Sequence, residues 1–206
     1  KSSKIVPEYD SKNPLIKRLF FARLKKALDL SMLSDAKESN VADFGCGDCI
    51  FLKFLEEKYK NIKTYGIDIL PQVLGNKNFL RAQLKISDLN DTRFENNFFD
   101  AIFCLDTLEH FENLSGPIGE IKRTLKPGGK LVVSLPTENF AYKLGRFLLK
   151  GTFSSKKGPS SSPHFHNAKQ LKRAILDNNF VAKSSKKIYP ILPLTFFEIV
   201  LFEKKS

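Results

Sequence analysis

The sequence predicts one α/β domain built on a mostly parallel sheet of seven strands. Short runs rich in β-branched and aromatic residues alternate with segments of helical periodicity, which is typical of βαβ units. A glycine-containing turn follows the first of these runs. The length of 206 residues suits one well-buried domain and is short for two.

The expected elements alternate regularly up to Pro136, after which the rhythm changes. Strands are expected at residues 40–45, 63–69, 84–89, 99–106 and 130–136, and within 180–189 and 195–202. Helices are expected at residues 14–30, 49–59, 71–80, 114–125 and 167–178. Between them, residues 137–166 combine an amphipathic stretch with a run rich in Gly, Ser, Pro and Lys, which is typical of a lid or binding element.

Composition sets limits on the function. The hydrophobic fraction is 42%, no apolar run is long enough to span a membrane, and the first ten residues lack the apolar core of a secretory signal, so we expect a cytoplasmic location. The net charge is +12, and residues 141–187 hold eleven Lys or Arg against one acid. This excess fits a solvated surface, an anionic substrate, an acidic membrane surface or nucleic acid.

A glycine-containing turn follows the first expected strand, and acidic residues lie at the ends of the second and third strands. Gly45 and Gly47 form the turn after the first strand, where a chain without Cβ atoms lets a ligand approach the backbone. Asp68 ends the second strand about twenty residues later, which is the usual spacing for a carboxylate that binds ribose hydroxyls. Asp88 ends the third strand. The carboxyl ends of parallel strands share one edge, so the pattern predicts a nucleotide site there.

The same turn contains Cys46 and Cys49, a Cys-x-x-C pair at the start of a helix. A thiol at that position can have a lowered pKa and redox activity, so a redox site is an alternative on local grounds. It gives no role to Asp68 or Asp88. A zinc site would need ligands from His110, His164 or His166 in addition to the two cysteines.

Five stretches resemble the class I S-adenosylmethionine-dependent methyltransferases in order and spacing, and cover residues 40–136: VADFGCGDC, YGIDIL, ISDLND, FDAIFCLDTLEHFEN and LKPGGKLVVSLP. The resemblance implies a Rossmann-like sheet with helices on both faces and an antiparallel last strand. It implies that residues 40–136 bind the cofactor, behind a helical cap at 1–35 and before a substrate or lid insertion at 137–166, with the last helix and two strands at 167–206.

The resemblance also implies roles for individual residues. The methionine part of the cofactor would be held by Asp43 and the backbone of Gly45, Cys46 and Gly47, and the ribose by Asp68 with Ile69. The adenine would lie against Asp88 and Leu89, and the sulfonium against Leu105 and Asp106. Cys49 is a departure, since many members have a third glycine there.

Asp106, Glu109 and His110 follow the fourth strand. His110 has the chemistry of a general base for a hydroxyl acceptor, or else makes local hydrogen bonds only. In ubiquinone-type O-methyltransferases a similar acid-x-x-Glu-His pattern binds a divalent metal, usually with Glu first. Asp106 is one methylene shorter, so we expect no metal; if one binds, His164 or His166 is placed to complete the site.

The acceptor is expected to be a small or lipid-like molecule methylated at oxygen. Tyr9 is a candidate lid residue, Arg18 and Arg23 are candidates to bind a substrate carboxylate, and the basic amphipathic stretch at residues 139–150 suits an anionic membrane surface or packing on the domain. RNA or DNA is the main alternative, because the C-terminal half is basic. Against it, LDTLEH replaces the Asn/Asp-Pro-Pro-aromatic motif of similar base-amine methyltransferases. A degenerate domain that binds without turnover is the non-enzymatic alternative.

Overall fold

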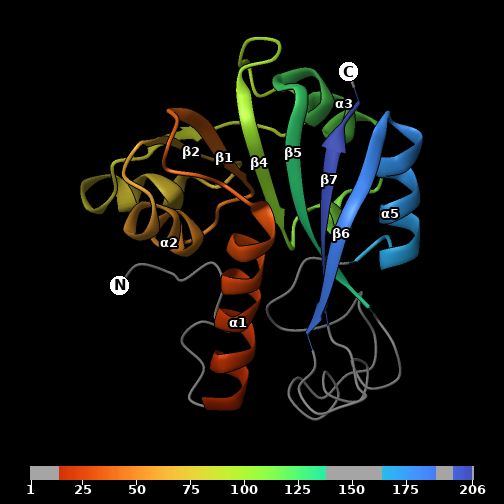
Figure 1. The fold of residues 1–206 in the computed structure, drawn as a ribbon, viewed down its shortest axis with the longest axis horizontal. Coiled ribbons are helices and arrows are strands. Elements are labelled where there is room, and N and C mark those ends of the chain that lie inside the picture. Colours follow the sequence, from red (N-terminus) through yellow and green to blue (C-terminus); the bar gives the residue numbers. More distant parts are fainter. Residues whose placement is uncertain (1–13, 138–163, 189–196, 206) are drawn as a thin grey trace.

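The structure is a computed structural model and describes residues 14–137, 164–188 and 197–205. Within these residues a seven-stranded sheet has the order β3-β2-β1-β4-β5-β7-β6 (Figure 1). Its strands are β1 (Ser39–Phe44), β2 (Ile62–Asp68), β3 (Gln83–Ile86), β4 (Phe99–Leu105), β5 (Leu125–Pro136), β6 (Phe180–Ile188) and β7 (Phe197–Lys204).

Strand directions agree with the predicted fold class. The first five strands pair in parallel, whereas β7 is antiparallel to both β5 and β6. Parallel neighbours require crossover connections, and helices lie in the connections from β1 to β2, from β2 to β3 and from β4 to β5. The Rossmann-like, mostly parallel sheet with an antiparallel last strand is therefore confirmed.

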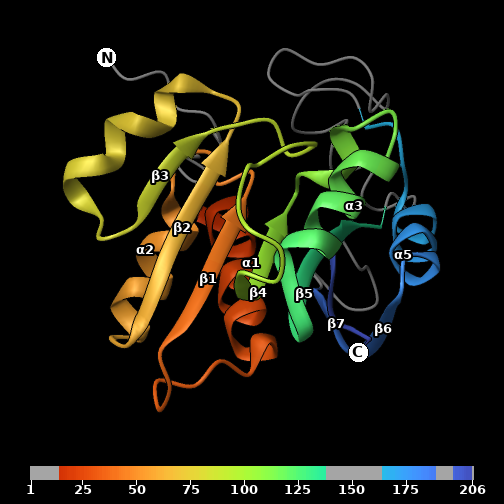
Figure 2. The ribbon, with the colours of Figure 1, turned by 90° about the horizontal axis from the view of Figure 1, so that it is seen from above.

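Helices cover both faces of the sheet, which Figure 2 shows from above. One face packs against α1 (Pro14–Ser31) and α2 (Ile50–Lys58), and the other against α3 (Ser115–Thr124) and α5 (Ala168–Asp177). Alternation along the strands explains both layers: Val41 faces the first layer and Ala42 the second. In the described part of the chain, no helix has the length and apolar character needed to cross a membrane.

Two elements of the structure differ from those expected from the sequence. The segment expected to be an α-helix at residues 71–80 is a 3₁₀ helix, η2 (Pro71–Phe79), in keeping with a Gly75-Asn76 pair that disfavours α-helix. The fifth strand begins at Leu125, five residues earlier than expected. Leu125 pairs with Phe99 and Lys130 with Ala101, so residues 126–129 interrupt the register as a bulge, and Gly128 has a φ of 71°.

Candidate functional site

The predicted ligand edge lies where the strand order reverses. β1 has β2 on one side and β4 on the other, and all three run in parallel. The chain leaves β1 towards β2 and β3 and later returns to form β4 and β5 on the opposite side. Ligands of open α/β sheets bind outside the carboxyl ends of the strands at such a switch point.

The turn after β1 is held tightly against β2 and β4. Gly45 N and Cys46 N both donate to Ile67 O, at 2.7 and 3.1 Å. Gly45 has a φ of 80°, and a Cβ there would lie 2.3 Å from Thr107 Oγ1. Glycine is therefore required at this position for both backbone conformation and space. The contact brings the backbone of the turn beside the exit of β4.

Asp68, at the end of β2, is oriented by backbone amides. Its side chain lies mostly buried, with 8% of the residue exposed. Oδ2 accepts a hydrogen bond from Gly47 N at 2.8 Å, and Oδ1 accepts one from Leu70 N at 3.0 Å. A carboxylate has about four lone-pair sites, so each oxygen retains one for a further donor. Two neighbouring hydroxyls of a ribose fit that capacity.

Asp43 points into the same region from β1 and is 3% exposed. Its pKa is raised to about 8, first by burial and then by the charge of Asp68, and Arg23 partly offsets both effects. At neutral pH the carboxyl group is therefore mostly protonated. A ligand cation placed beside it would favour the ionised form.

The cysteines of the turn do not have the properties of a redox pair. Cys46 and Cys49 are free and buried, with their sulfurs 3.9 Å apart. The hydrogen bond with Cys49 raises the pKa of Cys46, and burial raises it as well. Reactive thiols have a lowered pKa, so the redox alternative loses its physical basis. Cys49 caps α2 with a φ of 59°, a left-handed conformation that explains why glycine suits this position.

The remaining residues of the predicted cofactor edge lie around this turn. Ile69 follows β2 and is 64% exposed, an unusual position for a large apolar side chain. Asp88 is exposed and accepts hydrogen bonds from Asn90 N and Nδ2, both at 2.8 Å. Leu89 beside it is buried. Asp88 thus begins a turn that Asp91 N closes by donating to Asp88 O, and β3 itself stops at Ile86.

The exit of β4 contains a buried ionic contact that the sequence did not predict. Asp106 has a φ of 53° and lies after the buried Leu105. Its amide donates to Ser134 Oγ at 2.7 Å, and its carboxylate forms an ion pair with Arg23 from α1. Arg23 is 2% exposed. The guanidinium expected to bind a substrate carboxylate therefore binds one of this chain.

Sequence reasoning missed Thr107 and Ser134, and it missed the ion pair between Arg23 and Asp106. Each acts through a contact between segments that are distant along the chain or separated by a turn. One signal of the ion pair was present in the sequence: Arg23 is a charged residue on an otherwise apolar helix face. Its partner depends on tertiary packing.

His110 lies in the short 3₁₀ helix η3 (Leu108–His110), close to His164, which precedes α5. The two imidazole rings have centroids 5.0 Å apart. Glu109 is buried beside them. His166 lies apart from this group and has Nε2 3.1 Å from Glu112 O. Tyr9 and residues 139–150 lie outside the described residues.

Comparisons with known proteins agree with the fold. The family described as "Methyltransferase domain" matches residues 15–184. A structure of a putative S-adenosylmethionine-dependent methyltransferase from Listeria monocytogenes superposes with a TM-score of 0.70 at 15% identity, covering 94% of this chain and all of that one. The chain therefore belongs to the methyltransferase-domain family, and its fold is that of the S-adenosylmethionine-dependent class.

Two curated relatives carry the names of methyltransferases with different acceptors. A sterol 4-C-methyltransferase from Caenorhabditis elegans is 32% identical over 99 residues, which cover 44% of this chain and 29% of the relative. A ubiquinone biosynthesis O-methyltransferase from Xanthomonas oryzae pv. oryzae is 27% identical over 107 residues, covering 48% and 44%. The matched regions therefore cover less than half the length of each of these two relatives.

Proposed function

We propose that this protein transfers the methyl group of S-adenosylmethionine to an oxygen atom of a small or lipid-like acceptor. The observation that carries the proposal is the meeting of Asp43, the Gly45–Gly47 turn and Asp68 at the switch point of a methyltransferase fold. The turn offers a close backbone approach, and Asp68 retains acceptor capacity for two hydroxyls. These features fit a nucleoside carrying a cationic amino-acid tail.

The roles proposed for the site residues follow from their positions. Asp68 would accept the ribose hydroxyls, with Ile69 against the sugar, while Asp88 and Leu89 would flank the adenine. Asp43, with the backbone of Gly45, Cys46 and Gly47, would receive the methionine part. The α-ammonium group beside Asp43 would stabilise its ionised form.

Methyl transfer depends mainly on alignment. The cofactor supplies an already activated sulfonium, so the protein has to hold acceptor, methyl and sulfur in line. Leu105 and Asp106, at the exit of β4, would line the sulfonium end. The ion pair with Arg23 and a hydrogen bond donated by the Ser134 hydroxyl would fix the Asp106 carboxylate, which keeps this end of the site rigid.

His110 is the proposed general base. It is half-buried at the exit of β4 and follows Glu109 in η3. An imidazole titrates near neutral pH, which suits removal of a proton from a hydroxyl acceptor. The expected result of His110→Ala is a fall in kcat of about 100-fold or more with unchanged cofactor affinity. Equal losses in kcat and cofactor affinity would point to a structural role instead.

The acceptor class is supported by the relatives, which include a quinone-pathway O-methyltransferase and a sterol methyltransferase. We propose that residues 137–166 contribute to acceptor binding and that peripheral contact with an anionic membrane brings a lipid-like acceptor to the site. The stretch that would make this contact is residues 139–150, which includes Lys143, Arg146 and Lys150.

Turnover is the test of this proposal. The protein is incubated with methyl-labelled S-adenosylmethionine and a panel of phenols, quinols, sterols, amines and RNA, and formation of S-adenosylhomocysteine and labelled product is measured. The proposal predicts product from a hydroxylated small molecule. Product from RNA alone, with RNA affinity falling steeply with salt, would establish the nucleic-acid alternative. Cofactor binding without any product would support a degenerate domain.

A further inference from the structure

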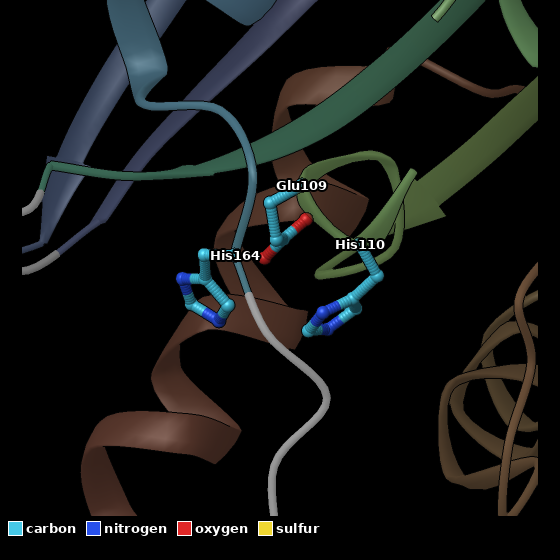
Figure 3. Close-up of side chains that lie close together, drawn as sticks. All are labelled: Glu109, His110 and His164. Atoms are coloured by element: carbon cyan, nitrogen blue, oxygen red, sulfur yellow. The ribbon is translucent and has the colours of Figure 1, made fainter. Parts of the chain in front are cut away.

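Three side chains beside the exit of β4, among them the proposed base His110, lie together although they come from two separate segments. Glu109 and His110 come from η3, and His164 comes from the segment before α5. Figure 3 shows the three side chains facing one another across these two segments. Their potential ligand atoms all lie within 4.8 Å of one another.

Backbone contacts hold the two segments together. Phe165 N donates to Glu109 O at 2.8 Å, so the residue after His164 is fixed directly to η3. His166 Nε2 lies 3.1 Å from Glu112 O and adds a second link. The arrangement of Glu109, His110 and His164 therefore follows from the fold, even though 54 residues separate the two histidines.

The chemistry of the group suits a metal ion. Glu109 is 1% exposed, and buried carboxylates in proteins are paired, hydrogen-bonded or bound to metals. Both imidazoles are half-buried and lie beside this carboxylate. Ligands of one such ion lie about 2.0–2.2 Å from it, so an inward movement of about 1 Å brings all three into range.

We propose that Glu109, His110 and His164 form a binding site for one divalent transition-metal ion. Two imidazole nitrogens and one carboxylate oxygen favour ions such as Zn²⁺, Fe²⁺ or Co²⁺ over Mg²⁺, which prefers oxygen ligands. Three protein ligands leave coordination positions open for water or for an oxygen of a bound molecule.

This ligand set differs from the acid-x-x-Glu-His pattern in the sequence. The carboxylate of Asp106, the first acid of that pattern, forms an ion pair with Arg23 and accepts a hydrogen bond from Ser134. His164 supplies the third ligand in its place. The site therefore joins the exit of β4 to the end of the 137–166 segment, which the sequence pattern alone would not do.

Metal binding would also change the part that His110 plays in the proposed function. An imidazole bound to a metal does not accept the acceptor's proton. A metal ion instead lowers the pKa of a hydroxyl bound to it. The metal site itself does not depend on the proposed methyl transfer, and its test below measures binding without turnover.

The test is titration of untagged, metal-free protein with Co²⁺, followed by visible absorption. The expected result is one equivalent of Co²⁺ bound, with the spectrum of nitrogen and oxygen ligands and without the charge-transfer band of a thiolate. Absence of the thiolate band would show that none of the three cysteines binds the ion. Competition is expected to show Zn²⁺ displacing Co²⁺, and Mg²⁺ in large excess having little effect.

The variants separate the proposed site from its alternatives. His164→Ala should weaken Co²⁺ binding more than about tenfold, since even loss of an outer-shell partner costs that much. His166→Ala is the matched control and should bind as the wild type does, and Asp106→Asn should too. His110→Asn supplies a second ligand variant if His164→Ala proves unfolded by circular dichroism. Absence of saturable binding, or loss in Asp106→Asn with retention in His164→Ala, would overturn the proposal.

Discussion

At the scale of single residues, the burial of Asp43 lowers the stability of the folded protein at high pH, and the same carboxyl group is proposed to bind the cofactor. Its pKa in the folded protein is about 8, whereas an unperturbed aspartate has a pKa of about 3.9. Because the folded-state pKa is the higher one, the folded state binds the proton more tightly. The stability linked to Asp43 is fully present below about pH 4 and is lost as pH rises through 8.

The Asp43→Asn variant tests both consequences. The variant should lose less stability than the wild type between pH 5 and pH 9, because its side chain cannot ionise. Urea unfolding followed by far-UV circular dichroism measures this, since the chain has no Trp to serve as a fluorescent probe. Equal pH dependence in both proteins would show that Asp43 does not titrate with a raised pKa.

Cofactor affinity should show the opposite trend with pH. A ligand ammonium group beside Asp43 would lower its pKa, so binding would release a proton below about pH 8 and affinity for S-adenosylhomocysteine would rise between pH 6 and 8. In Asp43→Asn, binding should be weaker and nearly independent of pH over this range. Calorimetry in two buffers of different ionisation enthalpy measures the released proton directly. A wild-type affinity that is constant from pH 6 to 8 would contradict the proposed role.

The glycine turn permits a prediction with a matched control. Gly45 and Gly128 have similar φ values, 80° and 71°, but a Cβ meets Thr107 at the first and nothing within 4 Å at the second. Gly128→Ala should cost about 1–2 kcal/mol for the left-handed backbone alone. Gly45→Ala should cost about 1–3 kcal/mol more because of overpacking. Equal losses in free energy of unfolding would show that Thr107 moves aside freely.

At the scale of elements, the contact between α1 and the exit of β4 depends on Arg23 and Asp106. The Arg23 side chain is 3% exposed and that of Asp106 is 24% exposed. Water can therefore solvate part of the Asp106 carboxylate if the ion pair is broken. The guanidinium also lies over the rings of Phe20 and Phe197, at 4.9 and 5.3 Å from their centroids. This arrangement holds the N-terminal helix against the sheet.

Removal of one partner should therefore cost more than removal of both. Arg23→Met leaves a partly buried carboxylate and should lower the free energy of unfolding by about 2 kcal/mol. The double variant Arg23→Met with Asp106→Asn should recover part of this loss, since no uncompensated charge remains. Urea unfolding of the wild type, Arg23→Met, Asp106→Asn and the double variant measures the coupling. Additive losses would mean that the ion pair contributes little.

Most elements could be predicted because their signals are local. Periodic apolar residues and the Gly-containing turn identified the strands, and the positions of Asp43 and Asp68 followed from strand direction. The bulge at residues 126–129 and the 3₁₀ form of η2 depend on small differences in backbone energy that periodicity does not report. The partners of Asp106 required packing between segments far apart in the sequence.

At the scale of the whole molecule, ligand binding at the switch point should stabilise the entire domain. The site contains parts of β1, β2 and β4, which lie at the centre of the sheet. S-adenosylhomocysteine at 100 times its Kd contributes about 2.7 kcal/mol, which raises the Tm of a domain of this size by about 5 to 10 °C. Differential scanning fluorimetry with an added dye measures the shift. An unchanged Tm at saturating ligand would contradict a site in the folded core.

The central claim is that Asp68 and the glycine turn bind the cofactor, and calorimetric titration with S-adenosylhomocysteine tests it most directly. Asp35→Ala is the matched control for Asp68→Ala, because Asp35 also accepts two backbone N–H groups, from Lys60 and Asn61. Those residues precede β2, at the opposite edge of the sheet. The account predicts wild-type and Asp35→Ala binding near −8 kcal/mol, about micromolar, and a loss of at least about tenfold in Asp68→Ala. No binding to the wild type, or equal binding by all three proteins, would contradict it.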